Sequence, residues 1–167
     1  VFRLFLKFAD WRRAHSGVIA VTTLTWAWGA MFLACALRRR WLGLLGFATA
    51  FQWTIYMGLY SFTLASGVGL FIIGIATDPD RVVTLRLRVL IACLLFVEAM
   101  FHDFAALLTG TVVALELLFR APAGRRLTEV ARVALMGIPA AALASLSLLS
   151  SPTPGVNTVW TIAERAS

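Results

Sequence analysis

The chain has few charged residues for its length. Charged side chains make up 14% of its 167 residues, whereas hydrophobic ones make up 60%. Residues 41–76 contain no charged side chain at all. This composition excludes an ordinary soluble domain and predicts an all-α integral membrane protein.

Acidic residues are scarcer than basic ones, 8 against 15, which gives a net charge of +7. The basic residues lie in short clusters between apolar runs, where loops on the cytoplasmic side of a membrane carry them. We therefore expect membrane lipids with anionic headgroups as partners, and no nucleic acid.

Cysteine is also rare, and the two cysteines, Cys35 and Cys93, show no ligand spacing. This excludes a disulfide framework and a zinc site, and we expect both side chains to pack as small apolar groups. Motifs for nucleotide hydrolysis, zinc proteolysis and serine hydrolysis are missing. The first residue is Val rather than Met, which leaves open whether the chain is a piece of a longer protein.

The apolar runs predict a polytopic transmembrane helical bundle of about six spans. We expect an interfacial amphipathic helix over 1–16, the bundle over 17–149 and an outer-side tail over 150–167. The individual spans are expected at 17–37, 41–57, 61–76, 84–100, 104–119 and 130–149.

Residues 89–119 decide the topology of the remaining chain. As a single helix they would be about 46 Å long, against a hydrocarbon core of about 30 Å. We favour two spans that turn at residues 101–103; one long tilted helix is the alternative. With the turn, most arginines fall on one side, which the positive-inside rule makes cytoplasmic in a bacterial inner membrane.

The same stretch carries Glu98, His102 and Asp103, and ionisable residues in so apolar a segment are candidates for function. Glu98 and His102 share a helix face because they are four residues apart, and Asp103 is next in line. The set is suited to acid–base catalysis, to a divalent metal, or to pigment or haem ligation through His102. The alternative is a structural turn. One histidine with two carboxylates is a weak metal signature, so no metal site is predicted and the cofactor stays open.

Other candidates come from polar side chains near the expected membrane interfaces. Gln52, Tyr56 and Tyr60 lie near the tip of the hairpin over 41–76, and we expect them to bind substrate. Glu116 is expected to pair with Arg120, four residues later. Basic side chains flanking the first span are expected to contact lipid headgroups: Arg3, Lys7, Arg12, Arg13, Arg38, Arg39 and Arg40.

Two segments carry a resemblance to a known family: YMGLYSFTLASGVGLFIIGIA and RVLIACLLFVEAMFHDFAALLTGTVVALELLFRA. Residues 41–126, which contain them, resemble the middle portion of bacterial GT-C-type glycosyltransferases that use lipid-linked sugars. His102 occupies the place where a histidine breaks a pair of spans in that family. The catalytic acidic loop of the family has no counterpart here, so the resemblance implies a core segment without the active site, or a small relative that lacks it.

Two functional hypotheses follow. The first is a GT-C-like membrane protein that binds a polyprenyl-phosphate-linked sugar between its spans. The second is a non-catalytic accessory subunit of a photosynthetic or respiratory complex, which packs against the helices of other membrane subunits.

Overall fold

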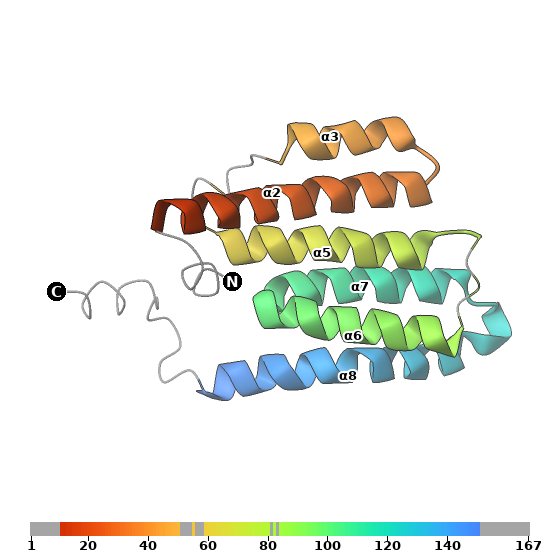
Figure 1. Ribbon diagram of the computed structural model, residues 1–167. Helices are drawn as coiled ribbons and strands as arrows, with labels where there is room; N and C mark the ends of the chain where they lie inside the picture. The colour runs from red at the N-terminus through yellow and green to blue at the C-terminus, as the bar shows by residue number, and fades with distance from the viewer. Residues whose placement is uncertain (1–10, 51–54, 56–58, 81, 83, 151–167) are drawn as a thin grey trace.

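The structure is a computed structural model, and it describes residues 11–50, 55, 59–80, 82 and 84–150 (Figure 1). Throughout this part of the chain the regular structure is helical and no strand occurs, so the all-α prediction is confirmed. The helices are α2 (Trp11–Ala36), α3 (Gly43–Ala48), α5 (Tyr60–Thr77), α6 (Leu85–Phe101), α7 (Asp103–Arg120) and α8 (Arg126–Ser150), with 3-10 turns η1 (Arg40–Leu42) and η2 (Ala123–Arg125).

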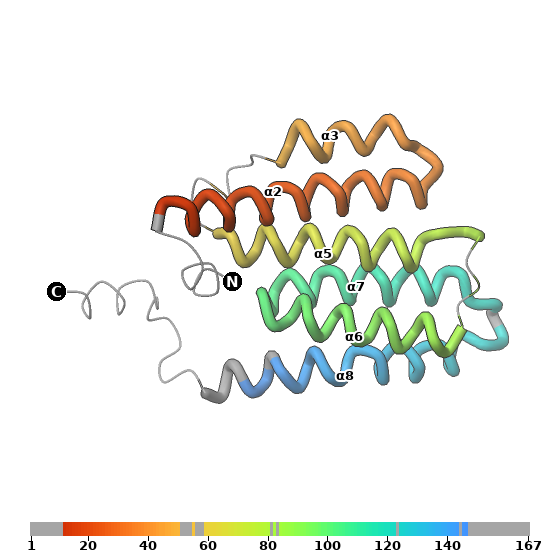
Figure 2. The backbone as a smooth tube through the Cα atoms, viewed as in Figure 1, coloured from red at the N-terminus to blue at the C-terminus, as the bar shows by residue number. Residues whose placement is uncertain are grey.

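Helix α5 lies at the centre of the bundle. It packs against α2 on one side and against α6 and α7 on the other. Helix α3 covers α2, and α8 covers α6 and α7 (Figure 2). The long helices lie side by side, with their axes along the long direction of the bundle (Figure 1).

Small residues allow α2 and α5 to approach closely, with Gly29 on α2 and Gly67 on α5 at the crossing. Ala65 and Gly69 of α5 are also buried, but Gly69 faces Glu98 and Thr109 of the neighbouring helices. The closest approach involves Gly67, whose position leaves no room for a Cβ against the α2 backbone at Thr25 and Trp26. Backbones can pack this tightly only where side chains are absent.

The other side of α5 contributes to the main hydrophobic core. Ile72 packs there with Ile91 of α6, Val113 of α7 and Met136 of α8. These side chains are at most 7% exposed. The four helices α5 to α8 therefore share one core.

Residues 89–119 form two helices rather than one. Helix α6 ends at Phe101, and His102 takes an extended backbone conformation with φ −164° and ψ 109° before α7 begins at Asp103. The predicted turn at residues 101–103 is therefore confirmed. With 17 and 18 residues, the two helices are each about 26 Å long, close to the thickness of a hydrocarbon core.

The start of α2 differs from the prediction. The helix begins at Trp11 and continues through Ser16 and Gly17, so the expected boundary between an amphipathic helix over 1–16 and the first span is wrong. A single glycine costs about 1 kcal/mol in a helix relative to alanine, which is too little to stop a long apolar helix. Residues 1–10 and the expected tail over 151–167 lie outside the described residues.

The expected span over 41–57 is not one continuous helix. Helix α3 ends at Ala48, and Thr49 adopts a turn conformation. The Thr49 hydroxyl donates to the Leu45 carbonyl oxygen at 2.8 Å and accepts from the Trp26 indole nitrogen at 3.2 Å. These bonds tie the end of α3 to α2.

The last helix is longer than its predicted span. Helix α8 begins at Arg126 and includes Pro139 in its interior. Its first turn carries Arg126 and Glu129, which places charged side chains on the helix where a loop was expected.

By length and apolarity, α2 (Arg12–Ala36) and α5 (Tyr60–Thr77) are the 2 candidate membrane spans among the described residues. Helices α6, α7 and α8 carry charged residues close to their ends, for example Arg88, Glu116 and Glu129. The 2 candidate spans among the described residues are fewer than the six predicted.

The two cysteines are free and exposed. Cys35 lies on α2 and Cys93 on α6. Both were expected to pack as small apolar groups, but they lie on the outer faces of their helices, outside the buried core.

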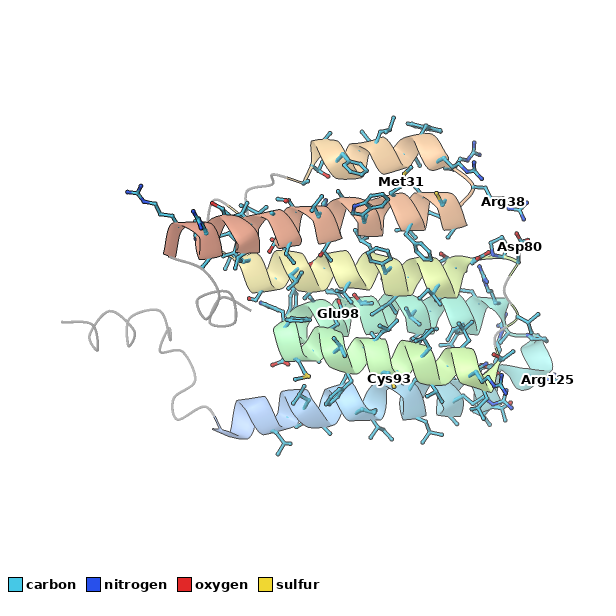
Figure 3. All side chains as sticks on the ribbon, viewed as in Figure 1. Met31, Arg38, Asp80, Cys93, Glu98 and Arg125 are labelled. Atoms are coloured by element: carbon cyan, nitrogen blue, oxygen red, sulfur yellow. The ribbon has the colours of Figure 1, made fainter. Side chains whose placement is uncertain are left out.

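The arginines predicted to share one side gather at one end of the bundle, where Figure 3 shows Arg38, Asp80 and Arg125. Arg38 pairs with Asp80 at 2.6 Å, which ties the end of α2 to the loop after α5. Arg120 donates to the carbonyl oxygens of Thr77 and Asp78 at the end of α5 and pairs with Glu116 at 2.7 Å. The predicted Glu116–Arg120 pair is thus confirmed. We call this the arginine end.

Candidate functional site

The break between α6 and α7 lies away from the arginine end, and Figure 3 shows Glu98 at a distance from Arg38 and Arg125. The His102 N–H donates to the Glu98 carbonyl oxygen at 2.9 Å, which closes the last turn of α6. Asp103 begins α7, where the partial positive charge of a helix N-terminus favours a carboxylate.

Glu98 is fully enclosed, with 0% of its surface exposed. Its Oε1 accepts a hydrogen bond from the Thr109 hydroxyl of α7 at 2.7 Å. Among the described residues Oε2 has no hydrogen-bond partner. Gly69 of α5 makes room for this pair, because a Cβ there would lie 2.6 Å from Oε1 and closer still to the Thr109 hydroxyl.

His102 faces a different neighbour. Its ring packs edge-on against Phe62 of α5, with ring centroids 5.1 Å apart. Its Nδ1 is buried and has no partner in the described part of the chain. A polar atom left unpaired in this way costs about 1 to 3 kcal/mol, and it keeps one nitrogen available to a hydrogen-bond donor or acceptor.

The candidate residues therefore do not form one cluster. Glu98 lies against α5 and α7, and His102 against Phe62, while Asp103 lines a pocket near α8. No group of His, Cys, Asp and Glu side chains that could hold a metal ion occurs among the described residues. The four-residue spacing of Glu98 and His102 correctly placed both near the break. Glu98 contacts Gly69 of α5 and Thr109 of α7, however, whereas His102 contacts Phe62 near the start of α5.

Asp103 stands at one end of an apolar pocket between α6, α7 and α8. The pocket has a volume of about 390 Å³ and extends along α7 from Asp103 to Ala114, a distance of about 16 Å. Leu107 and Ile138, which are 65% and 56% exposed, line it, so the pocket reaches the surface of the bundle. Its size is typical of a site for a small ligand.

Alanine and glycine make up half of the pocket lining. Gly137 of α8 is the clearest case, because a Cβ added there would meet nothing within 4 Å. This site was not predicted from the sequence. Small residues on α7 and α8 were its only signal, and their common pocket depends on how the three helices meet.

The substrate-binding candidates are described in part. Gln52 and Tyr56 lie outside the described residues. Tyr60 begins α5, and its ring packs edge-on against His15 of α2 at a centroid distance of 5.7 Å. The structure places it away from the pocket lining.

The lipid-headgroup candidates divide between the two ends of α2. Arg3 and Lys7 lie outside the described residues, Arg12 and Arg13 are exposed near the start of α2, and Arg38, Arg39 and Arg40 are exposed after its end. The helix has 26 residues and is about 39 Å long, so the two groups match the two interfaces of a bilayer with a core of about 30 Å.

Two further polar residues were missed. Thr109 is the partner of Glu98, and Glu129 bridges Arg88 and Arg132. A threonine in an apolar helix is too common to be singled out, but a glutamate between arginines near the start of a span is a usable signal for an ion-pair network.

The chain matches no protein-family model, no curated protein and no solved structure.

Proposed function

We propose that the chain is a multi-pass membrane protein in which α2, α5, α6, α7 and α8 all cross the bilayer. The distribution of side chains supports this. Large apolar side chains such as Trp28, Leu107 and Leu135 are exposed, whereas Thr22, Thr63, Glu98 and Thr109 are enclosed. An apolar exterior of this extent is favourable in lipid and costly in water.

The proposal includes a sixth crossing between α2 and α5. Helix α2 ends at the arginine end, and α5 begins at the opposite end of the bundle (Figure 1). Helix α3 follows α2 in the chain and lies along it, which supports a sixth crossing on the way to α5. The arginine end faces the cytoplasm of a bacterial cell by the positive-inside rule, and the break at His102 faces the outer side.

Within this bundle, the apolar pocket between α6, α7 and α8 holds part of the hydrocarbon chain of a polyprenyl-phosphate-linked sugar. The observation that carries this proposal is the pocket of about 390 Å³ with Asp103 at one end. Apolar walls suit an isoprenoid chain, and a carboxylate at the outer end accepts hydrogen bonds from sugar hydroxyls. The same class of ligand is what the expected resemblance of residues 41–126 to GT-C-type proteins implies.

Gly137→Leu is expected to weaken binding of a polyprenyl phosphate by at least about tenfold, because the leucine side chain occupies volume that the ligand needs. The position has no neighbour within 4 Å, so the variant is expected to fold. Native mass spectrometry of the purified protein in detergent micelles measures the bound fraction. Ala142→Leu is the matched control, since Ala142 is exposed on α8 and does not line the pocket.

Equal binding by Gly137→Leu, Ala142→Leu and the unaltered chain would contradict the proposal. The second candidate is a non-catalytic accessory subunit, and the observation that favours it is that Glu98, His102 and Asp103 do not converge on one site in the described part of the chain. For such a subunit we expect no saturable polyprenyl phosphate binding by the unaltered chain. The same titration therefore separates the two candidates.

A further inference from the structure

A second pocket opens between α6 and α8 at the arginine end. It has a volume of about 480 Å³ and is lined by Arg88 and Arg132 on its polar side. Its remaining lining is apolar and includes Val89 and Leu135, which are 55% and 65% exposed. A site with two guanidinium groups beside an apolar wall is amphipathic in the same way as a phospholipid.

An ion-pair network fixes the polar side of this pocket. Arg88 Nη2 contacts Glu129 Oε2 at 2.7 Å, and Arg132 Nη1 contacts Glu129 Oε1 at 2.8 Å. The side chains of Arg88 and Glu129 are only 11% and 10% exposed. Glu129 therefore holds Arg88 against α8.

The network leaves one donor group unused. Arg88 Nη1 is buried and has no hydrogen-bond partner among the described residues. Two cations share a single carboxylate, so the site keeps one net positive charge. A buried guanidinium with a free N–H edge is stabilised by an anion that can accept charge-assisted hydrogen bonds, and phosphate oxygens suit this geometry.

We infer that this pocket binds an anionic phospholipid. The phosphate accepts hydrogen bonds from the exposed side of Arg132 and, after a rotation of the Arg88 guanidinium toward the pocket, from Arg88 Nη1. An acyl chain lies against Val89 and Leu135. Charge complementarity, the unpaired donor and the apolar wall all favour this occupant. The inference rests on the proposed membrane location but concerns a site separate from the polyprenyl pocket, at the opposite end of α6.

Native mass spectrometry in detergent micelles tests the inference with phosphatidylglycerol and phosphatidylcholine as probes. We expect phosphatidylglycerol to bind the unaltered chain in preference to phosphatidylcholine. Arg88→Lys keeps the positive charge but loses the second guanidinium edge, so it is expected to weaken phosphatidylglycerol binding about tenfold, the value of one charge-assisted hydrogen bond. Arg86→Lys, an exposed arginine on the same helix outside the pocket lining, is the matched control and is expected to bind normally.

A second variant leaves the ion pairs intact. Val89→Trp fills the apolar part of the pocket and is expected to lower phosphatidylglycerol binding, whereas Val97→Trp, also exposed on α6, is not. If Arg88→Lys fails to fold, the comparison of Val89→Trp with Val97→Trp tests the inference by itself.

Three results would overturn the inference. The first is equal binding of the two lipids, and the second is normal phosphatidylglycerol binding by Val89→Trp. The third is that inorganic phosphate raises the melting temperature of the protein as much as phosphatidylglycerol does. Phosphatidylglycerol binding in micelles depends neither on polyprenyl binding nor on topology. Gly137→Leu does not alter this pocket, so it is expected to bind phosphatidylglycerol normally even where polyprenyl phosphate binding is lost. The two proposals can therefore fail separately.

Discussion

Replacing Glu129 by alanine is expected to lower the free energy of unfolding by about 3 to 5 kcal/mol, because Arg88 then remains buried without its counter-ion. Glu129 is 7% exposed and contacts both Arg88 and Arg132. Thermal unfolding in detergent micelles measures the change. Glu116→Ala is the matched control: its pair with Arg120 is 32% exposed on each side, and such helical pairs contribute only about 0.3 to 0.5 kcal/mol.

The stabilisation by Glu129 depends on pH in a defined direction. Burial raises the pKa of this carboxyl, but hydrogen bonds and positive charge from Arg88 and Arg132 outweigh burial and hold its pKa below the ordinary value of 4.5. Its contribution is therefore complete above the ordinary pKa and is lost as the pH falls through the lowered one. The difference in stability between the unaltered chain and Glu129→Gln should be constant near neutral pH and shrink below about pH 4.5. A difference that grows on acidification would contradict this assignment.

Replacing Gly67 by alanine is expected to destabilise the bundle by about 2 to 3 kcal/mol through overpacking. A Cβ at this position would lie 2.8 Å from the backbone C of Thr25 and the backbone N of Trp26. These atoms belong to the α2 backbone, so relief requires α2 and α5 to move apart, and no side-chain rotation is sufficient. The apparent melting temperature in micelles should fall by about 4 to 12 °C for a chain of this size.

Gly137→Ala is the control for this substitution. It introduces the same methyl group in a helix where nothing lies within 4 Å, and replacing a helical glycine by alanine contributes up to about 1 kcal/mol. The two variants should therefore shift the melting temperature in opposite directions. A similar shift for both would show that the close crossing at Gly67 does not hold the bundle together.

The sequence predicted the helix pair over 84–119 because its length and its charged residues conflict with a single span. The same reasoning failed at the start of α2, since Ser16 and Gly17 were taken as a boundary although tertiary packing can extend a helix through both. The length of helix α3 was overestimated for a similar reason. Hydropathy does not show that the helix ends before Thr49, whose hydroxyl accepts a hydrogen bond from the indole of Trp26.

The sites were harder to predict than the helices. Spacing alone placed Glu98, His102 and Asp103 near one end of the bundle, but it could not show which helix each side chain would contact. The partner of Glu98, Thr109, lies on the following helix, and the pocket beside Asp103 is lined by residues of three helices. Such contacts depend on how neighbouring helices are rotated relative to one another. The pattern of apolar residues does not determine this rotation.

The membrane topology is the central claim, and cysteine labelling tests it most directly. In a background with Cys35 and Cys93 replaced by alanine, single cysteines are introduced at His102 and at Arg125, which lie on either side of α7. Helix α7 has 18 residues and is about 27 Å long, so the two positions should fall on opposite faces of the bilayer. We expect a membrane-impermeant maleimide applied to intact cells to label the cysteine at position 102 and to leave the one at position 125 unlabelled until the membrane is opened. Labelling of both positions from the same side would contradict the account.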